Sequence, residues 1–214
     1  FAKVRYEFLK ALRTLHKVGP CVTVFGSPRF KEGHPSYNLA RELGSELALD
    51  GFAVMTGAGP GIMEAANRGA KDVDGRSVGC GIKLPFEQCL NPYLDVSMNF
   101  NYFFVRKVMM LKYSYAYVAL PGGFGTMDEL FETLTLVQTG KIKNFPVVLM
   151  DKGFWAPLVE SWRDKLLDQY GTICPKDMDL FLLTDSPEEA AEYIRSRTAV
   201  FGLKERTIAR KPLK

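Results

Sequence analysis

The feature that most constrains the fold of this chain is the alternation of short apolar runs with segments of helical period. Four mostly apolar runs of four or five residues stand between longer segments in which apolar residues repeat every three or four positions: 21–25, 52–55, 116–120 and 146–150. Such runs are typical of parallel strands, because both faces of each strand are buried. The sequence therefore predicts an α/β protein with a Rossmann-like, doubly wound, mostly parallel sheet and helices on both faces.

The length of 214 residues suits a single domain. We expect an N-terminal helix within residues 1–19, a single Rossmann-like domain over 20–200 and a basic C-terminal tail over 201–214. Residues 85–100 have no clean period, so they are predicted to form a loop.

Several classes of protein are excluded by composition. No run of 18 apolar residues occurs, so no membrane partner is expected. The four cysteines form no CxxC pair and the two histidines have no neighbour at ligand spacing, which predicts a reduced, cytoplasmic protein without a metal or a cofactor. The net charge of +4 is partly terminal, and no nucleic-acid partner is expected from a basic tail alone.

Glycines mark the ends of three predicted strands, and a helix follows each of them: Gly26-Ser27, the stretch with Gly57 and Gly59, and Gly122 to Gly125. A helix start offers free N–H groups and a positive dipole end to an anion, so these turns predict a phosphate-bearing ligand at one edge of the sheet. The spacing matches neither the dinucleotide fingerprint nor the Walker motif. A mononucleotide or sugar phosphate fits better, which makes 20–200 a nucleotide-binding domain.

The stretch 121–129 (PGGFGTMDE) carries the sharpest signal. Glycines at 122, 123 and 125 let a ligand approach the backbone without obstruction by a Cβ atom. A helix is predicted from about Thr126 to Thr139, with the Thr126 hydroxyl at its start and the Glu129 carboxylate on its first turn. The alternative is that Thr126 and Glu129 form an ordinary capping box.

This stretch resembles the PGGxGTxxE signature of the LONELY GUY (LOG) family, which often carries the label "lysine decarboxylase". Arg106-Lys107, Gly26-Ser27, the GAGPGIM segment at 57–63 and Gln138 also match the family pattern. The resemblance spans about residues 20–170. It implies hydrolysis of the N-glycosidic bond of a cytokinin riboside 5′-monophosphate to free base and ribose 5-phosphate. Because no lysine motif of a pyridoxal phosphate enzyme is present, we expect no lysine decarboxylase activity.

Departures from the family pattern lie around the substrate base. Ala58 stands where the second glycine of the loop is usual, Glu64 replaces a glycine of plant members, and 84–88 matches the substrate-contacting segment loosely. AMP or an N6-substituted AMP is the predicted substrate.

The resemblance and the chemistry together assign roles to individual residues. Cleavage passes through an oxocarbenium-like sugar, so we expect the Glu129 carboxylate to stabilise that charge and to position water. A helix N-terminus favours the ionised carboxylate. Arg106 is expected to separate this carboxylate from the phosphate, with Lys107 as a phosphate ligand and Glu87 as a further substrate contact.

Two other functions remain open on the sequence. A non-catalytic carrier of a nucleotide or nucleotide-containing cofactor could use the same glycine turns, and a DNA-processing protein could share the fold. The family resemblance also implies a homodimer or higher homo-oligomer, and the apolar run Tyr102–Met110 agrees with a covered helix face.

Overall fold

The computed structural model describes residues 1–85 and 89–198. Glu87, the expected substrate contact, and the basic tail 201–214 lie outside the described residues. None of the helices in the described ranges combines the length and apolar character needed to span a membrane.

The centre of the molecule is a parallel sheet. Within the described ranges it contains seven strands in the order β4-β3-β2-β1-β5-β6-β7, and each neighbouring pair runs parallel. The expected fold class is thereby confirmed. The strands are β1 Cys21–Phe25, β2 Ala53–Thr56, β3 Ser77–Ile82, β4 Val96–Phe100, β5 Ser114–Ala119, β6 Val147–Met150 and β7 Phe181–Thr184.

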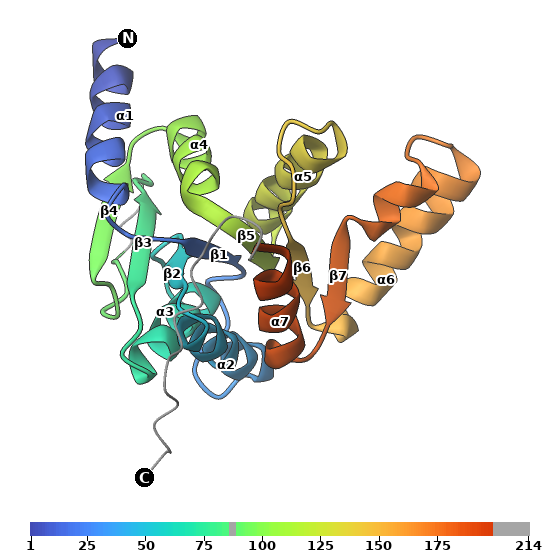
Figure 1. Ribbon diagram of the computed structural model, residues 1–214, viewed down its shortest axis with the longest axis horizontal. Helices are drawn as coiled ribbons and strands as arrows, with labels where there is room; N and C mark the ends of the chain where they lie inside the picture. The colour runs from blue at the N-terminus through green and yellow to red at the C-terminus, as the bar shows by residue number, and fades with distance from the viewer. Residues whose placement is uncertain (86–88, 199–214) are drawn as a thin grey trace.

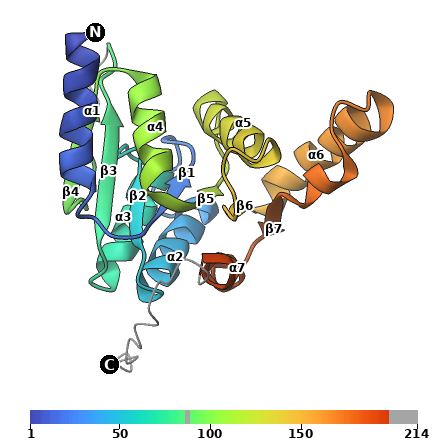
Figure 2. The same cartoon turned by 45° about the horizontal axis from the view of Figure 1, so that its top comes forward.

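Helices cover both faces of this sheet (Figures 1 and 2). One apolar core joins the sheet to α1, α4, α5 and α6, and a second core joins the opposite face to α2, α3 and α7. The helices are α1 Ala2–Leu15, α2 Pro35–Leu49, α3 Ile62–Asp72, α4 Phe103–Tyr113, α5 Phe124–Gln138, α6 Lys152–Trp162 (continued by a π-helical segment, Arg163–Gln169), a short 3₁₀ helix, Pro175–Asp179, and α7 Pro187–Thr198.

The direction of winding reverses between β1 and β5. From β1 the chain proceeds through β2 and β3 to one edge of the sheet, and β5, β6 and β7 then build the other side (Figure 1). The turns that follow β1 and β5 therefore meet side by side, where Ser27 N donates to Pro121 O at 2.9 Å. Such a switch point is where open parallel sheets bind their ligands.

The prediction of a continuous loop over 85–100 is wrong for its last part, because Val96–Phe100 forms the edge strand β4. Its register with β3 places Val96 opposite Val78 and Phe100 opposite Ile82. Met98 and Phe100 are buried while Ser97 and Asn99 are exposed. This alternation is that of an edge strand with one covered face, which differs from the continuous apolar runs of the central strands.

Candidate active site

The site begins at the N-terminus of α5. The helix starts at Phe124, two residues earlier than expected, with Gly123 as its N-cap and no side-chain cap. The Gly123 carbonyl accepts from the N–H groups of Thr126 (3.0 Å) and Met127 (3.1 Å). Thr126 is thus the third helical residue and Glu129 lies on the second turn, so the capping-box interpretation is wrong.

The three glycines of this turn have different physical requirements. A Cβ atom at Gly122 would collide with the Thr126 side chain, so the fold itself requires glycine there. At Gly123 and Gly125 a Cβ atom would meet open space, and neither residue has a positive φ. Among the described residues, no backbone carbonyl accepts from the N–H groups of Phe124 or Gly125. The exposed turn thus offers free donors and room for an anion.

The turn after β1 supports the α5 turn from the side. A Cβ atom at Gly26 would lie 2.7 Å from Cβ of Ile62, so this glycine admits the start of α3. The Ser27 carbonyl accepts from Ile62 N at 3.1 Å, and the Ser27 hydroxyl accepts from Arg29 N at 3.2 Å. Gly26 and Ser27 therefore both stabilise the structure of this turn.

The turn after β2 is shaped around Arg106. A Cβ atom at Gly57 would lie 2.5 Å from the Arg106 Nη2 atom. Ala58 is buried and has a φ of +65°, a backbone conformation that favours glycine. Ala58 N donates to the Thr56 hydroxyl at 3.0 Å, which holds the turn in this conformation.

A buried polar network that the sequence analysis missed also supports this turn. Asn67 Oδ1 accepts from the Thr56 hydroxyl at 2.6 Å and from Asn91 Nδ2 at 3.0 Å. Asn91 Nδ2 also approaches the Gly59 carbonyl at 3.2 Å. The signal in the sequence is Asn67 itself, a polar residue among the alanines and glycines on the buried side of α3.

Arg106 and Glu129 meet across the gap between α4 and α5. Arg106 Nε donates to the Cys80 carbonyl at 2.7 Å, and Nη1 lies 3.7 Å from Glu129 Oε1. The two side chains are only 11% and 6% exposed. Because 3.7 Å exceeds hydrogen-bond length, the pair attracts through charge and leaves some of the guanidinium N–H groups for another acceptor.

Lys107, expected to bind the phosphate, has carboxylates as its partners in the structure. Its ammonium group lies 2.9 Å from Asp128 Oδ1 and 2.7 Å from Glu132 Oε2, so it joins α4 to α5. Two carboxylates thus already neutralise the charge that was expected to bind phosphate.

Burial raises the pKa of Glu129 from 4.5 to about 7, although Arg106 and Lys107 oppose this shift. The expectation of a carboxylate ionised by the helix N-terminus is therefore wrong in direction, because Glu129 lies beyond the first turn and is desolvated. Asp128 and Glu132 raise the same pKa, and Tyr117 of β5 lies close enough to interact with Glu129. Within the described ranges, no three His, Cys, Asp or Glu side chains are grouped to hold a metal ion.

The fold and this geometry define a class of protein: a Rossmann-like α/β protein with an open helix N-terminus and a buried Arg–Glu pair at the switch point of its sheet. A family model described as "possible lysine decarboxylase" matches residues 63–194, which is more than half of the chain. The chain belongs to this family, the LOG family.

Curated relatives agree with this assignment, and a solved structure has the same fold. A cytokinin riboside 5′-monophosphate phosphoribohydrolase of Mycobacterium tuberculosis is 30% identical over 154 residues, which is 71% of this chain and 81% of that protein. A probable enzyme of the same name from Oryza sativa subsp. japonica is 39% identical over 88 residues, or 41% of this chain, and the match spans only 35% of that protein. The molybdenum cofactor carrier protein of Chlamydomonas reinhardtii shares the fold, with a TM-score of 0.61 at 24% identity over 85% of this chain and 99% of that chain.

We predict that Gly125→Ala separates stability from ligand binding. The new methyl group meets open space in a helix, so the free energy of unfolding stays level or rises by up to about 1 kcal/mol. Alanine keeps the backbone N–H, but its methyl group occupies the open space through which an anion approaches. Loss of one charge-assisted hydrogen bond for this steric reason lowers the affinity roughly 10- to 100-fold. Thermal unfolding and calorimetric titration with AMP measure the two effects.

Gly122→Ala is the matched contrast, because its methyl group collides with Thr126 and lowers stability. Unchanged AMP affinity in Gly125→Ala would show that no ligand approaches this turn.

Proposed function

We propose that this protein hydrolyses the N-glycosidic bond of a purine 5′-mononucleotide, AMP or an N6-substituted AMP, to free base and ribose 5-phosphate. The observation that carries the proposal is the buried Arg106–Glu129 pair beside the open N-terminus of α5. An anion site alone needs no buried carboxylate, because the carboxylate repels the anion. A reaction with a developing positive charge does need one.

In the proposed mechanism the α5 turn binds the 5′-phosphate. The free N–H groups of Phe124 and Gly125 donate to phosphate oxygens, and the helix dipole adds to the attraction. Arg106 supplies the cation that allows a phosphate and a carboxylate to occupy one site. Anchoring the phosphate in this way holds the anomeric carbon near Glu129.

Glu129 then acts on the sugar. Its carboxylate stabilises the oxocarbenium-like transition state and accepts a proton from the attacking water, which becomes the new hydroxyl of ribose 5-phosphate. A pKa of about 7 suits this second task, because the group can both take up and release a proton near neutral pH. The C1′–N bond breaks with its electron pair going to the base, and the base takes its proton from solvent water rather than from an assigned residue.

The names of the relatives support hydrolysis of an N-glycosidic bond. The site also favours this hydrolysis over decarboxylation of lysine. Lysine decarboxylases hold their cofactor through a lysine, and the lysine beside this site, Lys107, is paired with Asp128 and Glu132. We therefore propose a hydrolase without a cofactor.

A non-catalytic carrier of a nucleotide-containing cofactor is the second candidate, favoured by the fold shared with the molybdenum cofactor carrier protein. A carrier would bind its anionic cargo more tightly without Glu129, so the buried carboxyl argues for the enzyme. The DNA-processing alternative depends on the basic tail, which lies outside the described residues.

We predict that AMP is cleaved and adenosine is not. Three charge-assisted hydrogen bonds to the phosphate, at about 1.5–3 kcal/mol each, correspond to a ratio of roughly 10³ to 10⁶ in kcat/KM. Steady-state release of adenine from each compound, followed by chromatography, measures this ratio. Comparable values for the two substrates would refute the mononucleotide proposal.

Glu129→Gln should abolish turnover while AMP still binds, because the change removes charge but little volume. In the wild type, kcat/KM is expected to rise with pH around a midpoint near 7 as the Glu129 carboxyl loses its proton. A pH–rate series on the wild type tests the midpoint, and calorimetric titration with AMP tests binding by Glu129→Gln. A rate that falls through the same range would assign the active form to the protonated carboxyl instead.

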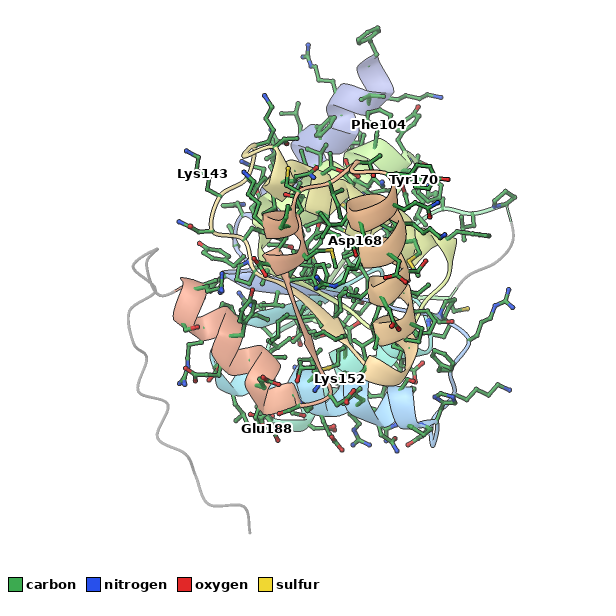
Figure 3. The ribbon with its side chains drawn as sticks, turned by 90° about the vertical axis from the view of Figure 1, so that its right-hand side faces the viewer. Phe104, Lys143, Lys152, Asp168, Tyr170 and Glu188 are labelled. Carbon is green, nitrogen blue, oxygen red and sulfur yellow. The ribbon has the colours of Figure 1, made fainter. Side chains whose placement is uncertain are left out.

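We also propose that a second copy of the chain covers the outer face of α4 and α5. Large apolar side chains are exposed there, and Figure 3 shows Phe104 at the outside of the molecule. Several exposed large apolar side chains on neighbouring helices favour an interaction surface. The residues are Phe103, Phe104, Val108, Phe124 and Phe131.

Light scattering at micromolar concentration should accordingly give at least twice the chain mass of 24.0 kDa. Phe104→Glu should shift the protein toward the monomer, whereas Leu49→Glu on α2, also exposed, should not. A wild-type mass of about 24 kDa would contradict the proposal.

A further inference from the structure

The helix that carries Arg106 has no N-terminal cap of its own. The N-cap residue of α4 is Tyr102, whose side chain caps nothing, and the first turn contains no acidic residue. The first N–H groups of a helix need acceptors, most of all when its end is covered by protein. An acceptor must therefore come from elsewhere in the chain.

Glu7 of α1, 94 positions away, is the acceptor for Asn101 and Tyr102, the two residues that lead into the helix. Glu7 is 4% exposed, and its carboxylate accepts from Asn101 N at 3.0 and 3.1 Å, from Asn101 Nδ2 at 2.7 Å and from Tyr102 N at 3.3 Å. A buried carboxylate at a helix N-terminus is stabilised both by these donors and by the helix dipole. Figure 2 shows α1 lying along α4 and β4.

The capped end of α4 lies one helical turn before the guanidinium-bearing residue. Arg106 N donates to the Tyr102 carbonyl at 3.2 Å, in the first backbone bond of the helix. At its other end, the Arg106 side chain is fixed to Cys80 O and lies 3.7 Å from Glu129. A shift of the first turn of α4 therefore changes the separation of Arg106 from Glu129.

We propose that Glu7 is a positioning residue that sets the place of Arg106 relative to Glu129 by holding Asn101 and Tyr102, from which α4 begins. The N-terminal helix thus has a duty at the site as well as in the apolar core, where Ala11 and Leu15 are buried. The effect on catalysis rests on the proposed function, whereas the effect on the Arg106–Glu129 pair does not.

The test is Glu7→Gln, which keeps the volume and one acceptor oxygen but removes the charge and turns an amide toward the donors. The readout is the carbon-13 NMR titration of the Glu129 carboxyl, identified by its absence in Glu129→Gln. Arg106 and Lys107 lower the Glu129 pKa, while Asp128 and Glu132 raise it and Tyr117 also interacts with this carboxyl. Displacement of Arg106 should therefore move the midpoint upward.

A merely structural role would lower the unfolding temperature and leave this midpoint unchanged. Glu42→Gln is the matched control. It makes the same chemical change at an exposed residue of α2, away from α4. Asn101→Ala removes the 2.7 Å bond alone, and it replaces Glu7→Gln if that variant does not fold.

We expect an upward shift in Glu7→Gln, no shift in Glu42→Gln, and a fall of about 10- to 100-fold in kcat/KM for AMP. An unchanged midpoint in Glu7→Gln, or in Asn101→Ala where that variant is used, overturns the inference. If the wild type releases no base from AMP, the proposed function is refuted. An upward shift of the Glu129 midpoint in Glu7→Gln would still support the role of Glu7 in that case.

Discussion

The buried guanidinium of Arg106 is the constraint on which the site depends. A charge removed from water is costly unless hydrogen bonds and an opposite charge compensate it. Here the Cys80 carbonyl and the Glu129 carboxyl do so, one from β3 and one from α5. The position of this group also explains Gly57, where any side chain would displace the guanidinium. Strand β3, the turn after β2 and helices α4 and α5 thus all contact or make room for the Arg106 side chain.

Further hydrogen bonds and ion pairs hold the elements around Arg106 and Glu129 on two sides. On one side Glu7 holds Asn101 and Tyr102, which lead into α4, and Lys107 joins the helix to α5 through two carboxylates. On the other, Asn67 and Thr56 hold the β2 turn and its left-handed Ala58. Buried hydrogen bonds and ion pairs of this kind rigidify their surroundings, which suits a site that must hold a small ligand in one orientation.

The sequence pattern predicts those elements whose structure depends on the burial or backbone freedom of neighbouring residues. The central strands are buried on both faces, so their apolar runs were recognised, and the glycine turns that follow them lie at the switch point. The edge strand β4 was missed because one covered face leaves only Val96, Met98 and Phe100 as an apolar signal. The start of α5 was placed two residues late because a glycine N-cap gives no side-chain signal.

The sequence by itself determined the α/β class, the glycine turns and the residue types available for chemistry, because hydrophobic period and backbone freedom are local properties. Only the tertiary structure decided which charges meet. It paired Lys107 with Asp128 and Glu132, placed Arg106 beside Glu129, and brought Glu7 to the start of α4. It also raised the pKa of Glu129, opposite to the expected direction, because desolvation depends on what packs around a carboxyl and outweighs the helix dipole beyond the first turn.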